Sequence, residues 1–154
     1  MSKGFTLVEL LVVIAIIVIL SGIILYSVTQ YINKGKDANI SGNLAVLIPA
    51  GEVFYTVENG AYNDGYNGFC DPSKNSVIKN AVLKMPQNSS GDCSSGLTPG
   101  VCCYVATPYY DSWAACAQEF TRSTKALCVD SRGVQEEIDN SYCLNTLNTT
   151  FKCP

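Results

Sequence analysis

The order of apolar and polar positions divides the chain into two unlike parts. Residues 5–25 hold 17 apolar residues out of 21, and the run is broken by Thr6, Glu9, Ser21 and Gly22. As an α-helix this stretch is about 31 Å long, which matches the hydrocarbon core of a bilayer. Helix is favoured over strand despite the many Val and Ile residues, because backbone polar groups in lipid must bond within their own segment. The pattern predicts a membrane-spanning helix.

An ordinary secretory signal peptide is the alternative interpretation of this run. The run is longer than the apolar region of a signal peptide, which has about 7–15 residues. Residues 26–31 offer no clear Ala-x-Ala cleavage site, and an acidic side chain, Glu9, lies inside the apolar segment. These features favour an anchor that stays with the protein.

Beyond residue 30 the pattern becomes amphipathic. Leu44, Leu47, Ile48, Gly51 and Tyr55 fall on one helical face, related by three- and four-residue steps. They predict that the helix continues with this face packed on a core. Pro49, together with Gly51, predicts a kink. The dipeptide at residues 59–60, Asn-Gly, predicts the end of the helix.

Short apolar runs separated by turn residues predict a small sheet in the second half of the chain. The strand candidates are residues 101–106, 114–120 and 126–129, and their close spacing favours an antiparallel meander whose apolar face covers the helix. Residues 77–85 predict a short helix or strand, and residues 87–100, rich in Ser, Gly and Pro, predict a loop. The fold class predicted is therefore α+β.

The cysteines indicate the compartment. The chain has eight, and all follow residue 69: Cys70, Cys93, Cys102, Cys103, Cys116, Cys128, Cys143 and Cys153. An even number scattered through polar sequence is typical of a disulfide framework in an oxidising compartment, whereas the paired CxxC knuckles of a zinc site are absent. Neighbouring Cys102 and Cys103 are expected on opposite faces of a strand, so each is expected to pair elsewhere. The sequence alone does not choose among the possible pairings.

Composition excludes several classes of function. The chain has no histidine, which removes the commonest general base and metal ligand, so no enzyme, cofactor or metal site is predicted. Asp64, Asn67 and Asp71 carry oxygen ligands, but their spacing does not match an EF-hand and is more typical of turns. The net charge is −3, and no basic run exceeds Lys34 and Lys36, so no footprint of nucleic-acid binding is visible.

Glu9 is the lone charge of the apolar segment. A carboxylate at the centre of a spanning helix costs about 2.5–3.5 kcal/mol on insertion scales, less near an interface, and such a residue usually has a partner. Lys3 lies six residues before Glu9 and the next base, Lys34, lies 25 residues after it, so neither is expected to pair with it. A cut between Gly4 and Phe5 would create an α-ammonium one helical turn before Glu9, for pairing in the same chain or in a packed neighbour.

These residues resemble the class III signal of type IV pilins and type II secretion pseudopilins. The chain begins Met-Ser-Lys-Gly and continues Phe-Thr-Leu-Val-Glu; in that family the leader is short and basic and ends in Gly, the first mature residue is usually Phe, and the fifth is Glu. The resemblance implies that Gly4–Phe5 is the bond cut by a prepilin peptidase, that Phe5 is N-methylated, and that Glu9 forms an assembly ion pair with the new terminus.

The resemblance also implies an organisation. It gives a cleaved leader at residues 1–4, a helix over residues 5–59 whose residues 5–25 span the membrane and later form the filament core, and an extracytoplasmic head over residues 60–154. The expected shape is a lollipop, with the helix packed on a small antiparallel sheet and loops closed by disulfides. Since pilins often close a C-terminal loop in this way, Cys143–Cys153 is the first expected pair and Cys128–Cys143 the alternative.

The function implied is that of a structural subunit. The precursor is expected in the inner membrane as a single-pass protein, and the mature chain in an extracellular filament or a periplasmic pseudopilus. The expected partners are other pilins, a prepilin peptidase, a platform membrane protein and an assembly ATPase. Major pilin, minor pilin and pseudopilin all stay open, and a type IV pilus is favoured because a cysteine-rich head suits surface exposure.

A pilin head that binds DNA or a surface is a second hypothesis. Aromatic and basic residues in the second half of the chain offer stacking and charge: Tyr104, Tyr109, Tyr110, Trp113, Arg122 and Lys125. The net negative charge argues against strong phosphate binding.

Overall fold

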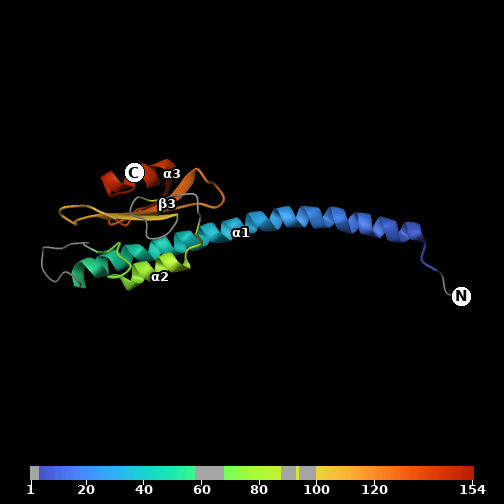
Figure 1. The fold of residues 1–154 in the computed structure, drawn as a ribbon, viewed down its shortest axis with the longest axis horizontal. Helices are drawn as coiled ribbons and strands as arrows, with labels where there is room; N and C mark the ends of the chain where they lie inside the picture. Colours follow the sequence, from blue (N-terminus) through green and yellow to red (C-terminus); the bar gives the residue numbers. More distant parts are fainter. Residues whose placement is uncertain (1–3, 58–67, 88–92, 94–99) are drawn as a thin grey trace.

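The structure is a computed structural model that describes residues 4–57, 68–87, 93 and 100–154. A long helix projects from a small head that holds a sheet between helical layers (Figure 1). The elements in chain order are α1 (Leu7–Val57), α2 (Ser76–Lys84), β1 (Val101–Val105), β2 (Trp113–Gln118), β3 (Lys125–Asp130), β4 (Gln135–Asp139), α3 (Asn140–Asn145) and α4 (Leu147–Thr150). The α+β fold class and the lollipop shape are confirmed.

The second half of α1 packs on the sheet through a narrow stripe. Ile40, Leu44, Leu47, Gly51 and Phe54 are buried at alternating steps of four and three residues, so they share the face that meets the head. The sequence predicted Leu44, Leu47 and Gly51 on this face, but it placed Tyr55 there in error.

Tyr55 is 46% exposed, and the buried aromatic residue of this turn is Phe54, one position earlier. α1 also stays helical through Pro49, although a proline removes one backbone hydrogen bond. Pro49 is exposed, and the packing of the flanking buried residues holds the helix on the head. The predicted end at residues 59–60 lies outside the described residues.

The four strands form an antiparallel meander in the order β1-β2-β3-β4, as the sequence predicted for its first three strands. Both faces of this sheet are covered, which the sequence did not predict. One face carries Val101, Trp113 and Val129 against α1, and the other carries Ala126 and Ile138 beneath α3 and α4. Burial on both sides explains why β1 and β2 are apolar at almost every position.

Four elements went unpredicted or were left ambiguous. β4 has the sequence Gln-Glu-Glu-Ile-Asp, whose one buried side chain is Ile138, and polar composition concealed it. α3 and α4 come from an Asn- and Thr-rich tail that has weak helical preference. Residues 77–85 were left as helix or strand; the structure has the helix α2, whose start is capped by the Asn75 side chain.

Candidate functional site

The N-terminus of α1 is closed by a reciprocal pair of hydrogen bonds. The Glu9 carboxylate accepts from the backbone N–H of Thr6 at 2.9 Å and from the Thr6 hydroxyl at 2.8 Å. The Thr6 hydroxyl oxygen accepts in turn from the N–H of Glu9 at 3.3 Å. This is a capping box, in which a residue before the helix and the third helical residue satisfy each other's backbone donors. The spacing Thr-x-x-Glu was the sequence signal for it, and the sequence analysis did not use it.

Gly4 and Phe5 precede this cap. Both lie outside the helix, which begins at Leu7, and both are exposed, Phe5 to 77%. A bond in exposed backbone outside a helix is accessible to a peptidase in a way that a helical bond is not. The capping box stands one residue beyond that bond, so a cut there would leave Thr6 and Glu9 intact.

Residues 7–25 of α1 project away from the described part of the head (Figure 1) and present apolar side chains on every side. The large apolar residues between 5 and 25 are each at least 47% exposed. Among the described residues, one helix is long and apolar enough to cross a membrane, and that helix is α1. The Ser and Thr hydroxyl groups in the first half of α1 are satisfied within the helix: Ser21, Ser27 and Thr29 donate to the carbonyl oxygens four residues earlier.

The head is joined to α1 where the helix leaves this exposed segment. Asp37 accepts hydrogen bonds from the backbone N–H groups of Phe120 at 2.6 Å and Thr121 at 3.1 Å, in the turn after β2. The Lys36 ammonium lies 4.4 Å from the centre of the Phe120 ring, a cation–π contact. The turn between β2 and β3 is thereby fixed to the helix.

A charge cluster lies beside this joint. Arg122, half exposed, donates to the buried carboxylate of Glu119 and to that of Glu137 on β4. Burial raises the pKa of Glu119 above its usual value, and the neighbouring Arg122 charge opposes that rise. The hydrogen bond from Lys125 to Asp139, at 2.8 Å, raises the pKa of Lys125. These pairs link the ends of β2, β3 and β4.

All eight cysteines form disulfides within the head. The pairs are Cys70–Cys103, Cys93–Cys102, Cys116–Cys143 and Cys128–Cys153. The expectation that Cys102 and Cys103 pair separately is confirmed, because they lie on opposite faces of β1.

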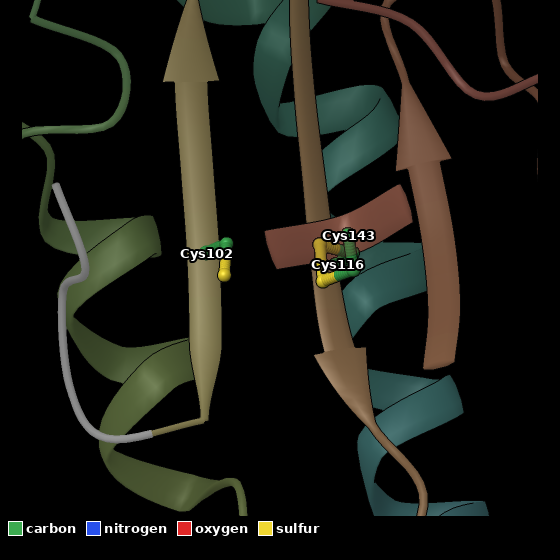
Figure 2. Close-up of side chains that lie close together, drawn as sticks. All are labelled: Cys102, Cys116 and Cys143. Atoms are coloured by element: carbon green, nitrogen blue, oxygen red, sulfur yellow. A yellow bond between two sulfur atoms is a disulfide. The ribbon is translucent and has the colours of Figure 1, made fainter. Parts of the chain in front are cut away.

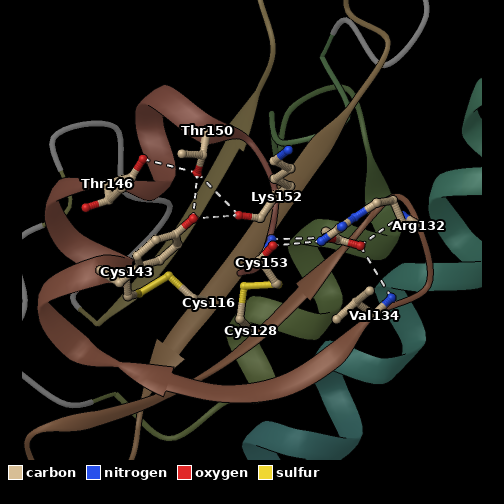
Figure 3. Close-up of a disulfide and its surroundings, with 11 residues drawn as sticks. Cys116, Cys128, Arg132, Val134, Cys143, Thr146, Thr150, Lys152 and Cys153 are labelled. Carbon is tan, nitrogen blue, oxygen red and sulfur yellow. Dashed lines mark hydrogen bonds and ion pairs between the residues drawn. A yellow bond between two sulfur atoms is a disulfide. The ribbon is translucent and has the colours of Figure 1, made fainter.

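The expected pair Cys143–Cys153 and its alternative Cys128–Cys143 are both wrong. Cys143 belongs to α3, and α4 lies between it and Cys153. Both helices lie across the outer face of the sheet, so the two cysteines stand over different strands (Figure 3). Cys143 joins β2 and Cys153 joins β3. The tail is therefore tied to the sheet at two points instead of closing on itself.

The second of these points is strengthened by a buried carboxylate. Asp130, fully buried, accepts from the N–H of Cys153 at 3.0 Å and from the Arg132 guanidinium at 2.6 Å, and the same guanidinium donates to the Cys153 carbonyl at 2.7 Å (Figure 3). The charge is thus paired and hydrogen-bonded, as a buried charge must be. The chain end is held by a disulfide, an ion pair and backbone bonds together.

The residues proposed for DNA or surface binding do not gather on one surface. Trp113 is fully buried toward α1, and Tyr104, which is 7% exposed, is buried on the opposite face of the sheet. Arg122 and Lys125 are occupied by the acidic partners described above. Of the aromatic residues in this set, Tyr109 alone is largely exposed. The structure gives no support to this hypothesis.

Of the oxygen ligands Asp64, Asn67 and Asp71, whose spacing was compared with that of an EF-hand calcium loop, the structure describes Asp71. Asp71 accepts hydrogen bonds from the hydroxyl and backbone N–H of Ser73, in a turn, and the Ser73 hydroxyl lowers the pKa of Asp71. Asp64 and Asn67 lie outside the described residues. Asp71 therefore does what the sequence analysis expected of an Asx residue in a turn.

Comparison with known proteins points to one family. Residues 1–25 match the family model of the prokaryotic N-terminal methylation motif. The chain is 28% identical over 109 residues to a type IV wide pilus major component of Thermus thermophilus, covering 70% of this chain and 82% of that protein. No solved structure matches it.

Two relatives from Moraxella bovis match over a shorter region. The chain is 54% identical over 44 residues to a type IV major alpha-pilin and 51% identical over 44 residues to fimbrial protein Q. Each match covers 29% of this chain and 28% of the relative, so the chain spans less than a third of the length of these two proteins.

Proposed function

We propose that this chain, which belongs to the type IV pilin family, is a structural subunit of a type IV pilus. A prepilin peptidase removes residues 1–4, Phe5 becomes an N-methylated terminus, and the subunit polymerises through its apolar helix. A platform membrane protein and an assembly ATPase drive the polymerisation. The precursor is held in the inner membrane, and the mature chain forms an extracellular filament with other pilins.

One observation carries this proposal: about the first five turns of α1, residues 7–25, are apolar and exposed on every side, and Glu9 in the first turn is their one charged residue. A helix that is apolar all round needs lipid or other apolar helices around it. Glu9 has no cationic partner among the described residues, whose ion pairs all lie in the head. A new α-ammonium at Phe5 would supply the missing positive charge.

Pairing between subunits would make this charge a device for register. A carboxylate and an ammonium buried between apolar helices stabilise only the arrangement that brings them together, because an unpaired buried charge is strongly unfavourable. Each arriving subunit would be aligned by the position of Glu9 against the terminus of a neighbour. The head, tied together by four disulfides, would face the solvent outside the filament core.

Mass analysis of filaments sheared from producing cells tests this function. The expected result is an abundant extracellular species that begins at Phe5, carries one methyl group on its terminus and contains four disulfides. A chain of full length, or one that begins elsewhere, contradicts the proposal. A mature chain found only in the cell envelope indicates a periplasmic pseudopilus instead.

A variant at the cut supplies the control. Gly4→Ser is expected to block leader removal and to leave the full-length chain in the inner membrane, since the side chain changes the residue before the scissile bond. Mature-length protein from this variant would show that the cut lies elsewhere.

A further inference from the structure

Three cysteine sulfurs meet inside the head at the centre of the sheet. The Sγ atoms of Cys102, Cys116 and Cys143 all lie within 4.8 Å of one another, and the three residues are at most 1% exposed (Figure 2). They belong to two different disulfides, Cys93–Cys102 and Cys116–Cys143. All three sulfurs are already oxidised in disulfides, so they are not available as metal ligands. Their proximity instead allows exchange between the two disulfides.

Strand register places them there. Cys102 on β1 lies directly opposite Cys116 on β2, and both side chains point to the face covered by α3. Residues opposite each other on antiparallel strands have Cβ atoms about 4.5–5.5 Å apart. A disulfide needs a Cβ separation of about 3.5–4.5 Å, so a small local shift would allow a bridge between these strands.

We propose that Cys102, Cys116 and Cys143 form a thiol–disulfide exchange centre that passes reduction of the Cys93–Cys102 bridge on to the Cys116–Cys143 bridge. The entry point is Cys93, which is partly exposed, whereas the other three cysteines are buried. The reductant is an external dithiol. The consequence is that α3 is released from the sheet when a bridge at the edge strand β1 is opened.

The electrons and atoms balance in two steps. A thiolate of the dithiol attacks the Cys93 sulfur, Cys102 leaves as a thiolate, and the second thiol of the reductant resolves the mixed disulfide, which leaves Cys93 reduced and the dithiol oxidised. The Cys102 thiolate then attacks the Cys116 sulfur, a Cys102–Cys116 bond forms, and Cys143 leaves with the electron pair and takes up a proton. The second step consumes no further reductant.

The third bridge on this face, Cys128–Cys153, stays outside the centre. Cys128 lies opposite Cys116 on β3, but its sulfur does not belong to the group within 4.8 Å. Cys128–Cys153 is held in addition by the Asp130 and Arg132 contacts. Exchange is therefore confined to β1, β2 and α3.

Removal of Cys93 tests the proposal without any reductant. In full-length Cys93→Ala, exported and solubilised in detergent, Cys102 is left as a thiol beside the Cys116–Cys143 bridge. After incubation at pH 8, acid trapping, alkylation and peptide mapping are expected to show loss of the Cys116–Cys143 peptide and appearance of Cys102 linked to Cys116 or Cys143. The rate is expected to rise about tenfold for each pH unit below the thiol pKa, because the thiolate is the attacking species.

Cys70→Ala is the matched control. It frees Cys103, the sequence neighbour of Cys102, on the other face of the sheet, away from the three sulfurs. This variant is expected to keep its three remaining bridges and to carry its one thiol on Cys103. Intact Cys128–Cys153 in both variants reports that the head is folded.

Two outcomes overturn the proposal. One is Cys93→Ala with its thiol fixed on Cys102 and Cys116–Cys143 intact, and the other is equal scrambling in both variants. If Cys93→Ala does not fold, the wild-type chain is treated with limiting dithiothreitol and trapped over time. A Cys102–Cys116 or Cys102–Cys143 peptide must then appear together with reduced Cys93, and its absence rejects the exchange centre.

Discussion

Glu9 has hydrogen-bond partners within its own chain. Its carboxylate accepts two hydrogen bonds from Thr6, which satisfy it at the helix terminus. A cap of this kind contributes about 1 kcal/mol, which is less than the cost of burying an unpaired carboxylate. Under the proposed function, the cap would hold Glu9 in place before assembly and would leave its charge to be neutralised by an ammonium. The two interactions can act one after the other.

Substitution of Glu9 separates insertion from assembly. Glu9→Val is expected to leave membrane insertion and leader removal intact, because the apolar side chain extends the spanning segment, and to reduce filament yield by at least about tenfold, which corresponds to losing about 1.4 kcal/mol of pairing. The measurement is the mass of sheared filament per cell relative to membrane-bound subunit. Thr6→Ala removes the cap and keeps the charge, so it is expected to assemble far better than Glu9→Val. Normal yield from Glu9→Val would contradict the ion pair.

Glu119 is a second residue whose charge sets a measurable property. Its pKa is higher in the folded chain than the ordinary value of 4.5, because its side chain is 5% exposed. At pH values between the ordinary pKa and the raised pKa, Glu119 binds more protons in the folded chain than in the unfolded chain. The free energy of unfolding therefore falls as pH rises through that window. At neutral pH the ionised carboxylate therefore lowers the free energy of unfolding relative to its protonated form.

The neutral amide isolates this effect. Glu119→Gln is expected to raise the denaturant midpoint of the head modestly at pH 7 and to leave it unchanged at pH 4, where the native carboxyl is largely protonated. Trp113, the single tryptophan and fully buried, reports unfolding by its fluorescence. Glu137→Gln removes the other acidic partner of Arg122 from a half-exposed site and is expected to give no such gain. A lower midpoint for Glu119→Gln at pH 7 would show that the ion pair outweighs burial.

At the scale of elements, the sequence predicted those whose pattern reflects one dominant force. The apolar run and the stripe through Leu44 and Leu47 gave α1, and the short apolar runs gave β1 to β3. The sequence did not predict β4, because Ile138 is its one buried residue. The strand forms because it pairs with β3, and its own composition gives little sign of it. The disulfide pairing was wrong because it depends on which strand lies beneath α3, a tertiary fact that spacing along the chain does not contain.

The contact of α1 with β2 gives a sharp test of packing between elements. A Cβ on Gly51 would lie 2.6 Å from Nε1 of Trp113 and 2.9 Å from two carbon atoms of its ring. Gly51→Ala is therefore expected to force the helix away from the sheet and to lower the free energy of unfolding by about 1–3 kcal/mol, the range for overpacked cores. Denaturant unfolding followed by tryptophan fluorescence measures it.

Gly42→Ala is the matched control on the same helix. A Cβ there would meet nothing within 4 Å, and the residue is exposed. The substitution is expected to stabilise the chain by up to about 1 kcal/mol, because alanine favours the helix over glycine. Equal effects from the two alanines would show that Trp113 does not pack against Gly51 as described.

At the scale of the whole molecule, α1 serves two environments that do not overlap. Its first buried side chain is Ile40, and its first polar contacts with the head are made by Lys36 and Asp37. The part of α1 before residue 30 projects away from the head (Figure 1). The stability of the head and the insertion or assembly of the apolar segment should thus be separable properties of one continuous helix.

Truncation at two points tests that separation. A chain of residues 29–154 keeps Asp37 and every buried side chain, so it is expected to be a soluble monomer with four disulfides and a free energy of unfolding within about 0.5 kcal/mol of the full chain in detergent, as for changes at exposed sites. A chain of residues 41–154 loses the Asp37 bonds to the turn after β2 and the buried Ile40, and it is expected to be less stable by at least about 2 kcal/mol. Size-exclusion chromatography and denaturant unfolding of both chains provide the measurements. If the longer fragment aggregates or unfolds as easily as the shorter one, the apolar half of α1 contributes to the head's stability, and a filament contact cannot be altered without also altering the fold.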